Sequence, residues 1–207
     1  MHIVDGALSA PVLVVGSVLA AVGVGVGLRH MPMEKIPAAG VLSATFFVAS
    51  LVHVPIGPSS VHLILNGLAG LILGWAVFPA VFVALLLQAV FFGFGGLTVL
   101  GVNTLDIALP AVAVYYLCRP GIVRSSPRGA AIWGAIGGAL AIALTTVCVG
   151  LALAFSGSAF IPAAKLVFVT HIPVMAIEAV ITAAAVYLTR RVKPELFVSF
   201  AAPAARA

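Results

Sequence analysis

Histidine carries the clearest chemical signal in this sequence. The chain has five histidines, and imidazole nitrogen is the commonest side-chain ligand for transition metals in proteins. His30 follows Arg29 in a polar stretch and needs no special role. The other four are His2, His53, His62 and His171. Any one of them alone fits an interfacial polar anchor, but four gathered at one face of the protein would indicate a site for a divalent transition metal.

His2 has a further property because it is the second residue. A free α-amine, the amide nitrogen of residue 2 and its imidazole Nδ1 can chelate one ion in two fused rings. The amine, with a usual pKa of about 8, loses its proton easily, whereas the amide hydrogen leaves only for a strongly Lewis-acidic metal. One in-plane position then remains for another imidazole. This square-planar set favours Ni(II) or Cu(II) and can be met by Co(II), whereas zinc prefers a tetrahedral site with sulfur or carboxylate ligands.

The composition shows what kind of protein must position these residues. Of the 207 residues, 7% are charged and 63% are hydrophobic, whereas soluble domains have about a quarter charged and about half apolar residues. Such a chain cannot cover a water-facing surface, which excludes a soluble enzyme, a disordered chain and an ordinary nucleic-acid-binding domain. Cys118 and Cys148 lie far apart in apolar runs, which disfavours a disulfide framework or thiolate site. The sequence predicts an all-α integral membrane protein in the lipid bilayer.

Charge-free stretches of about 20 residues set the number of expected crossings. Residues 36–105 contain no Asp, Glu, Lys or Arg, and a Pro-Gly-Ser cluster at 55–60 and a break at Pro79 divide them. We expect a single domain over residues 1–207, whose residues 1–8 form an N-terminal metal-binding segment. The bundle should contain seven transmembrane helices near residues 7–28, 36–54, 61–78, 80–97, 104–118, 129–154 and 163–189.

The ten basic residues orient these helices. Seven crossings place nine of them on one side and leave only Lys165 on the other. Because cytoplasmic loops carry an excess of Lys and Arg, we expect the N-terminus outside and the C-terminus in the cytoplasm. The four singled-out histidines then fall at the outer side, which supports a metal site there. The start lacks the basic region and cleavage site of a secretory signal peptide.

Four segments resemble the CbiM/NikM family, the substrate-binding membrane subunits (S components) of energy-coupling-factor transporters for cobalt and nickel. They are Met1-His2-Ile3-Val4-Asp5-Gly6, Gly57-Pro58-Ser59-Ser60-Val61-His62, Gly95-Gly96-Leu97-Thr98-Val99-Leu100-Gly101-Val102-Asn103-Thr104, and His171-Ile172-Pro173-Val174 followed by Glu178. The resemblance covers essentially the whole chain. It departs at one point, because many relatives have Ser-His-Pro-Thr-Gly where this chain has Ser60-Val61-His62-Leu63-Ile64.

The resemblance implies a ligand set, a cargo and partners. The metal would be held by the Met1 amine, the amide and imidazole nitrogens of His2, and His62, in a bundle of seven helices in a bacterial or archaeal cell membrane. The cargo would be Co²⁺ or Ni²⁺, and no cofactor beyond the ion is expected. This chain has no P-loop, so ATP would be hydrolysed by two ATP-binding subunits joined through a scaffold T component. A small accessory membrane subunit is a further candidate partner.

Five other polar residues keep more than one interpretation. His53 could be a ligand, a group on the entry path or an interfacial residue. Asn103 and Thr104 could orient imidazoles by hydrogen bonds or cap the fifth helix. His171 could support a ligand or anchor its own helix. Glu178 is an ionisable group inside the membrane, where such groups are costly and often functional, although hydrogen bonding within the bundle is the safer interpretation.

Two other classes of function agree less well with the sequence. A self-sufficient secondary transporter or channel for divalent metal is the alternative, but Glu178 alone is poor material for proton coupling. An intramembrane protease is disfavoured, because neither HExxH nor a GxSG-type motif with a partner histidine occurs. The protein is therefore not expected to be an enzyme. The choice between cobalt and nickel stays open, since both ions suit the same nitrogen ligands.

Overall fold

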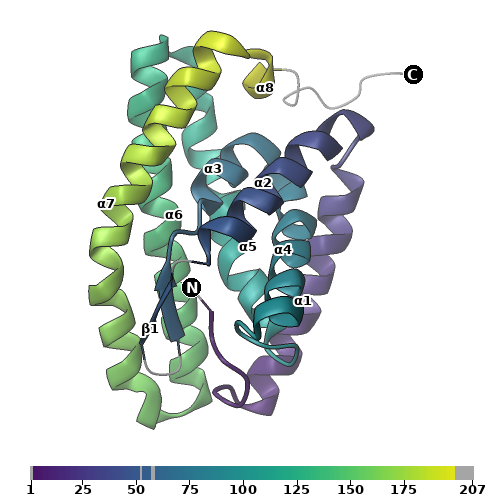
Figure 1. The fold of residues 1–207 in the computed structure, drawn as a ribbon, viewed down its shortest axis with the longest axis vertical. Coiled ribbons are helices and arrows are strands. Elements are labelled where there is room, and N and C mark those ends of the chain that lie inside the picture. Colours follow the sequence, from purple (N-terminus) through teal and green to yellow (C-terminus); the bar gives the residue numbers. More distant parts are fainter. Residues whose placement is uncertain (1, 52, 57–58, 199–207) are drawn as a thin grey trace.

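The computed structural model describes residues 2–51, 53–56 and 59–198, with the side chains of 53–56, 59–61 and 198 outside the description. This part of the chain is an elongated bundle of helices (Figure 1). Five helical stretches of the described residues are long and apolar enough to cross a membrane. They are Ala10–Arg29, Asn66–Phe92, Leu100–Arg124, Pro127–Ser156 and Ser158–Val192. The predicted class, an all-α multi-pass membrane protein, is confirmed.

The elements follow one another in a simple order along the chain. They are α1 (Ala10–Arg29), η1 (Met33–Lys35), α2 (Ile36–Ala49), β1 (His53–Ile56), β2 (Ser59–His62), α3 (Asn66–Leu73), η2 (Gly74–Ala76), α4 (Val77–Phe92), α5 (Leu100–Arg124), α6 (Pro127–Ser156), η3 (Ser158–Phe160), α7 (Ile161–Val192) and α8 (Glu195–Val198). The two strands pair antiparallel, with His53 opposite His62 and Ile56 opposite Ser59. The hairpin lies beside α7 (Figure 1).

The predicted helix boundaries were wrong in the middle of the chain. The predicted helices 36–54 and 61–78 overlap residues 53–56 and 59–62, which form the two strands of the hairpin instead. The break predicted at Pro79 lies earlier, at Gly74, whose φ of +59° suits glycine. Gly93, with a φ of +65°, ends α4 at Phe92 rather than at 97. The predicted fifth helix, 104–118, is the longer α5, which starts at Leu100 and continues to Arg124.

Glycine lets α1 approach the rest of the bundle. Its buried residues, Gly16, Ala20, Gly23 and Gly27, fall on one stripe. A Cβ atom at Gly23 would lie 2.4 Å from the ring of Phe78, whereas one at Gly25 would meet nothing within 4 Å. Small residues at such contacts are typical of helix packing in lipid, where close van der Waals contact must supply the attraction. The other side of α1 exposes large apolar side chains, as a lipid-facing surface requires.

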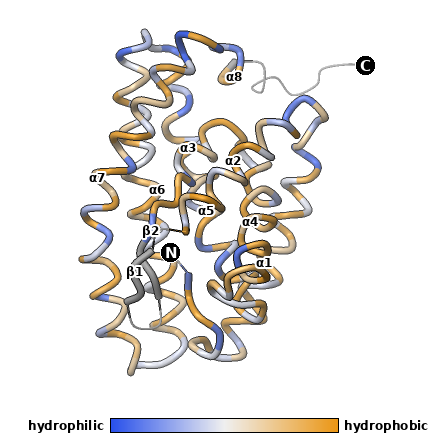
Figure 2. Tube along the Cα trace, in the orientation of Figure 1, coloured by the Kyte–Doolittle hydropathy of each residue, from blue (hydrophilic) through white to orange (hydrophobic). Residues whose placement is uncertain are grey.

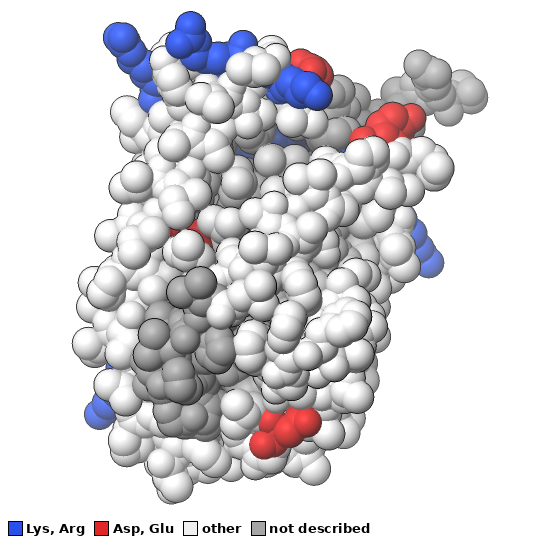
Figure 3. All heavy atoms as spheres, viewed as in Figure 1, with Lys and Arg blue, Asp and Glu red and all other residues white. Residues whose placement is uncertain are grey.

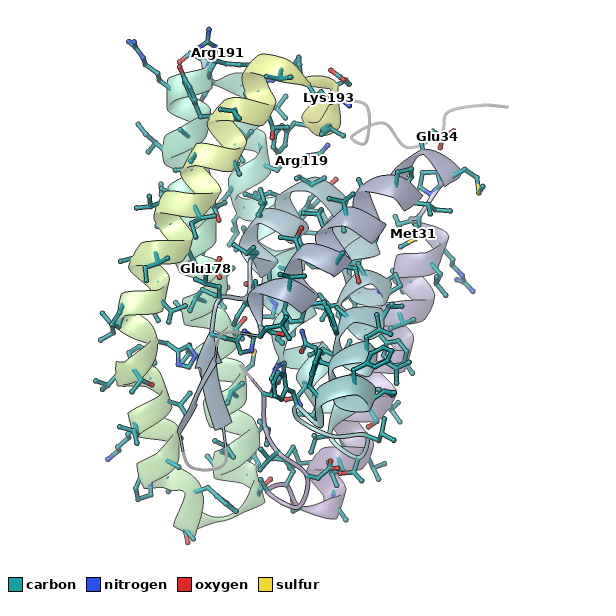
Figure 4. All side chains as sticks on the ribbon, in the orientation of Figure 1. Met31, Glu34, Arg119, Glu178, Arg191 and Lys193 are labelled. Carbon is teal, nitrogen blue, oxygen red and sulfur yellow. The ribbon has the colours of Figure 1, made fainter. Side chains whose placement is uncertain are left out.

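Charge is concentrated at one end of the bundle. Hydrophobic residues run along the helices, and hydrophilic ones collect near α8 and the turn between α1 and α2 (Figure 2). Lys and Arg side chains gather at the same end, where Arg191, Lys193 and Arg119 lie (Figures 3 and 4). Between the two ends the helices are apolar over a length that suits a membrane-spanning zone.

Candidate metal centre

His2 and His62 lie side by side inside the bundle. Their ring centres are 4.6 Å apart, with the ring planes inclined by 32°. The two residues are only 3% and 4% exposed. Phe94 stacks on the ring of His2, and Phe46 meets the ring of His62 edge-on. Two imidazoles that are far apart in sequence therefore share one enclosed, largely apolar site.

The hydrogen bond of His62 determines which of its ring nitrogens can bind a metal. His62 is the last residue of β2, and its Nδ1 lies 2.6 Å from the carbonyl oxygen of Leu63. A carbonyl oxygen only accepts hydrogen bonds, so Nδ1 must carry the proton. The lone pair of the neutral ring is then on Nε2, so Nε2 is the nitrogen that is able to bind a metal.

Asn103 on α5 holds the chain next to His2. The N–H of Ile3 donates to Asn103 Oδ1 at 2.9 Å, and Asn103 Nδ2 donates to the carbonyl oxygen of Ile3 at 3.0 Å. Asn103 is 2% exposed and Ile3 is fully buried. One side-chain amide thus satisfies both main-chain groups of residue 3. These two hydrogen bonds to the main chain determine where the preceding residue, His2, lies.

The turn after α4 completes this clamp on the N-terminal segment. The N–H of Asp5 donates to the carbonyl oxygen of Gly95 at 2.9 Å, and Thr98 Oγ1 donates to the Asp5 carboxylate at 2.5 Å. A Cβ atom at Gly96 would lie 2.1 Å from the carboxylate of Asp5, and its φ is +130°. Glycine at this position therefore leaves room for the N-terminal segment.

The structure places the other predicted site residues as follows. Met1 and the side chain of His53 lie outside the described residues, although the main chain of His53 pairs with that of His62 across the hairpin. Thr104 donates from Oγ1 to the carbonyl oxygen of Leu100 within its own helix, 2.7 Å away. The suggestion that Asn103 or Thr104 caps the fifth helix is wrong, because α5 already begins at Leu100.

Two buried groups of α7 lie on the hairpin side of the bundle. His171 is fully buried, and its Nδ1 donates to the carbonyl oxygen of Val167 at 2.6 Å. Glu178 is also fully buried, and its Oε1 accepts hydrogen bonds from the N–H groups of Ile64 and Leu65 at 2.6 and 2.8 Å. The link from Glu178 to the segment after His62 could not be derived from the sequence. Its only signal was an ionisable residue in an apolar helix.

The potential metal-binding atoms of this site are nitrogens. In the part of the chain that the structure describes, no three His, Cys, Asp or Glu side chains gather as a metal cluster would require. The side chains described here supply two imidazoles at this point. Further ligands would have to come from main-chain nitrogen or from groups outside the described residues. Phe94 and Phe46, which enclose the pair, were not predicted, because aromatic residues are ordinary in apolar helices.

The described residues thus form a membrane-spanning helical bundle that encloses a pair of imidazoles, which are common ligands of transition metals. The comparison with known families agrees with these features. The model of the family described as the cobalt uptake substrate-specific transmembrane region, CbiM, matches residues 2–196. The chain therefore belongs to the CbiM family.

Individual relatives support this assignment. A Haemophilus influenzae protein whose name describes metal transport is 42% identical over 95% of this chain and 96% of its own length. The fused nickel transport protein NikMN of Rhodobacter capsulatus is 34% identical over 99% of this chain, which spans 66% of that protein. The crystal structure of a truncated transition metal transporter covers 92% of this chain and is itself covered to 99%, with a TM-score of 0.71 at 27% identity.

The clamp on Ile3 can be tested directly. Asn103→Ala removes two buried hydrogen bonds of about 1 kcal/mol each, so hydrogen exchange at the Ile3 amide should become roughly 30-fold faster. Hydrogen–deuterium exchange with mass spectrometry measures this. Thr104→Val is the matched control, because it deletes a hydroxyl that bonds only within α5 while nearly keeping the volume. Equal protection of Ile3 in both variants would show that Asn103 does not hold the segment.

Proposed function

We propose that this chain is the substrate-binding membrane subunit of an ATP-driven importer of cobalt or nickel ions. Its ligands are the Met1 amine, the amide and imidazole nitrogens of His2, and His62. The observation that carries the proposal is the buried His2–His62 pair, whose ring centres are 4.6 Å apart.

The spacing of the two rings suits adjacent corners of a square-planar ion. A nitrogen ligand about 2.0 Å from the metal, on a ring whose centre is roughly 1.1 Å farther, gives cis imidazoles with centres about 4.4 Å apart. In the His2 chelate the central ligand is the amide nitrogen, so the free fourth corner is next to the His2 imidazole. His62 would occupy that corner.

The surroundings of the two rings favour this ligand set. The bond from Nδ1 of His62 to the Leu63 carbonyl leaves Nε2 as the metal-binding atom. The Asn103 clamp on Ile3 places residue 2 beside it. Both rings are buried, and their nitrogen donors disfavour hard cations, whose preferred ligands are oxygens.

Partner subunits supply the energy in this proposal. The sequence has no P-loop, and the Rhodobacter capsulatus relative is a fused protein that extends beyond the part matched here. Such fusions indicate that members of the family work with other transport components. A scaffold T component and two ATP-binding subunits, with a small accessory membrane subunit as a further candidate, would complete the importer.

The secondary-transporter alternative is less well supported. Proton coupling needs a titratable group that can exchange its proton during the cycle. Among the described residues of the long helices, the acidic side chains are Asp106 and Glu178. Glu178 is occupied by two main-chain N–H groups, and Asp106 lies with Cys148 in the lining of a groove between α1, α5 and α6. Neither belongs to a visible chain of acidic groups.

Metal binding should depend on His62 and on a free Met1 amine. Replacement of His62 by Ala should weaken Ni²⁺ affinity by more than the roughly 10–100-fold that loss of an outer partner costs, and the visible spectrum of the bound ion should change. A long extension before Met1 turns the amine into an amide and should abolish binding. Titration of the purified chain, made with its native N-terminus, measures both effects.

Two controls accompany this experiment. His30→Ala removes an exposed histidine at the basic end, and a C-terminal extension of equal length leaves Met1 free, so both should bind as the parent does. If His62→Ala kept the parental affinity, His62 would not be a ligand. If the N-terminal extension left affinity unchanged, the amine chelate would be wrong.

Uptake should require ATP hydrolysed by another chain. In sealed vesicles the chain alone should bind nickel without concentrating it, and addition of the family's T component and ATP-binding subunits with ATP should produce uptake. Radioactive nickel inside the vesicles is the readout, and ATP-binding subunits that lack the P-loop lysine are the control. Uphill accumulation by the chain alone would establish the secondary-transporter function instead.

The orientation proposed for the bundle is N-terminus outside and C-terminus cytoplasmic. Ser125 and Ser158 flank α6, whose 30 residues extend over about 45 Å, enough to cross the bilayer. In a variant without Cys118 and Cys148, a membrane-impermeant maleimide should label Ser158→Cys in intact cells. It should label Ser125→Cys only after permeabilisation. The opposite pattern would invert the bundle, and labelling from one side would contradict a crossing by α6.

A further inference from the structure

Glu178 lies where α7 meets the chain that leads from β2 to α3 (Figure 4). Its side chain is fully buried. A single oxygen, Oε1, accepts two main-chain hydrogen bonds, from Ile64 at 2.6 Å and from Leu65 at 2.8 Å. Two main-chain N–H groups donate to this one oxygen, so the contact holds residues 64 and 65 against α7.

The local backbone explains why such a contact is needed. Leu65 has a φ of +57°, a left-handed conformation that is unfavourable for a residue with a side chain. It precedes α3, whose first N–H groups have no partner within the helix. The residue at the N-cap, Leu65, has an apolar side chain, which makes no capping hydrogen bond to this helix. The carboxylate from α7 therefore stabilises a strained turn that the local sequence does not favour by itself.

One peptide group connects this contact to His62. The N–H of Ile64 and the carbonyl of Leu63 belong to the same planar amide. On one edge that amide donates to Glu178 Oε1 at 2.6 Å, and on the other it accepts from His62 Nδ1 at 2.6 Å. An amide whose N–H donates a hydrogen bond becomes a better acceptor at its oxygen. The peptide group thus transmits both orientation and polarisation from Glu178 to the imidazole.

We propose that Glu178 is a positioning residue for the metal ligand His62 and acts through the Leu63–Ile64 peptide group. The inference rests on the proposed function, in which His62 Nε2 binds the ion. Glu178 fixes the plane of the peptide, the peptide oxygen holds Nδ1–H, and the ring then directs Nε2 toward His2. Metal-binding histidines commonly gain orientation and basicity when a carboxylate accepts from their second nitrogen. Here a peptide group stands between the carboxylate and the ring.

A pair of variants of similar size separates hydrogen bonding from space filling. In Glu178→Gln the amide oxygen can still accept from Ile64 and Leu65, whereas in Glu178→Met no acceptor remains. We expect Glu178→Met to bind Ni²⁺ roughly 10–100-fold more weakly and to shift the visible absorption of the bound ion. Glu178→Gln should keep the parental spectrum and an affinity close to the parent. Nickel titration of the purified chain with its native N-terminus measures both properties.

Asp106→Asn is the control for altering a buried acidic group elsewhere in the bundle. Asp106 is 5% exposed and lies on α5, so this variant should bind nickel as the parent does. If Glu178→Met keeps the parental affinity and spectrum, or if Glu178→Gln is as impaired as Glu178→Met, the positioning role is overturned. If Glu178→Met fails to fold, Glu178→Asp replaces it. The shorter carboxylate should shift the spectrum, and an unchanged spectrum would overturn the proposal.

Failure of this inference is distinguishable from failure of the proposed function. His62→Ala is measured in the same series. Loss of binding in His62→Ala together with parental behaviour of Glu178→Met would overturn the role of Glu178 and leave His62 as a ligand. Parental binding in His62→Ala would overturn the ligand assignment, and with it the positioning role.

Discussion

The pairing of Asn103 with the main chain of Ile3 is the interaction on which the candidate site depends. A segment that enters an apolar bundle brings main-chain N–H and C=O groups that are costly to bury without partners. Asn103 satisfies both groups of residue 3 at once. Residue 2 is thereby held at the bundle interior, and His2 reaches His62. Without this pairing, the same apolar surroundings would oppose entry of the segment.

The site then exploits what such an arrangement offers chemically. In the proposed ligand set, the N-terminal segment offers the metal an α-amine as well as an amide nitrogen. An internal loop has no α-amine to offer. The described side chains contribute two imidazoles, one from the N-terminal segment and one from the hairpin. Selectivity in the proposed mechanism comes from the nitrogen ligands and their planar geometry, because thiolates and carboxylates are not brought together in the described residues. Asn103 on α5 and Glu178 on α7 bond to the main chain beside His2 and His62 rather than to the two rings themselves.

Parts of the fold were predicted from the sequence and parts were not. Long apolar stretches with few charged residues correctly indicated α1, α6 and α7, because the length of an apolar run must match the membrane. The hairpin strands at residues 53–56 and 59–62 were missed, since their apolar residues resemble those of the neighbouring helices. The start of α5 was placed too late, at residue 104 instead of Leu100. Asn103 instead lies within the helix and directs its amide to Ile3.

The sequence by itself determined that this is a helical membrane protein, and its opening residues and glycine-rich block indicated the CbiM family. These features are local: composition, run length and short motifs are present before folding. Only the tertiary structure decided that His2 meets His62, that Asn103 binds a residue 100 positions away, and that Glu178 binds the peptide beside His62. The physical reason is that hydrophobicity drives burial without specifying partners. Which buried polar groups pair depends on how the helices pack and on the geometry of each hydrogen bond.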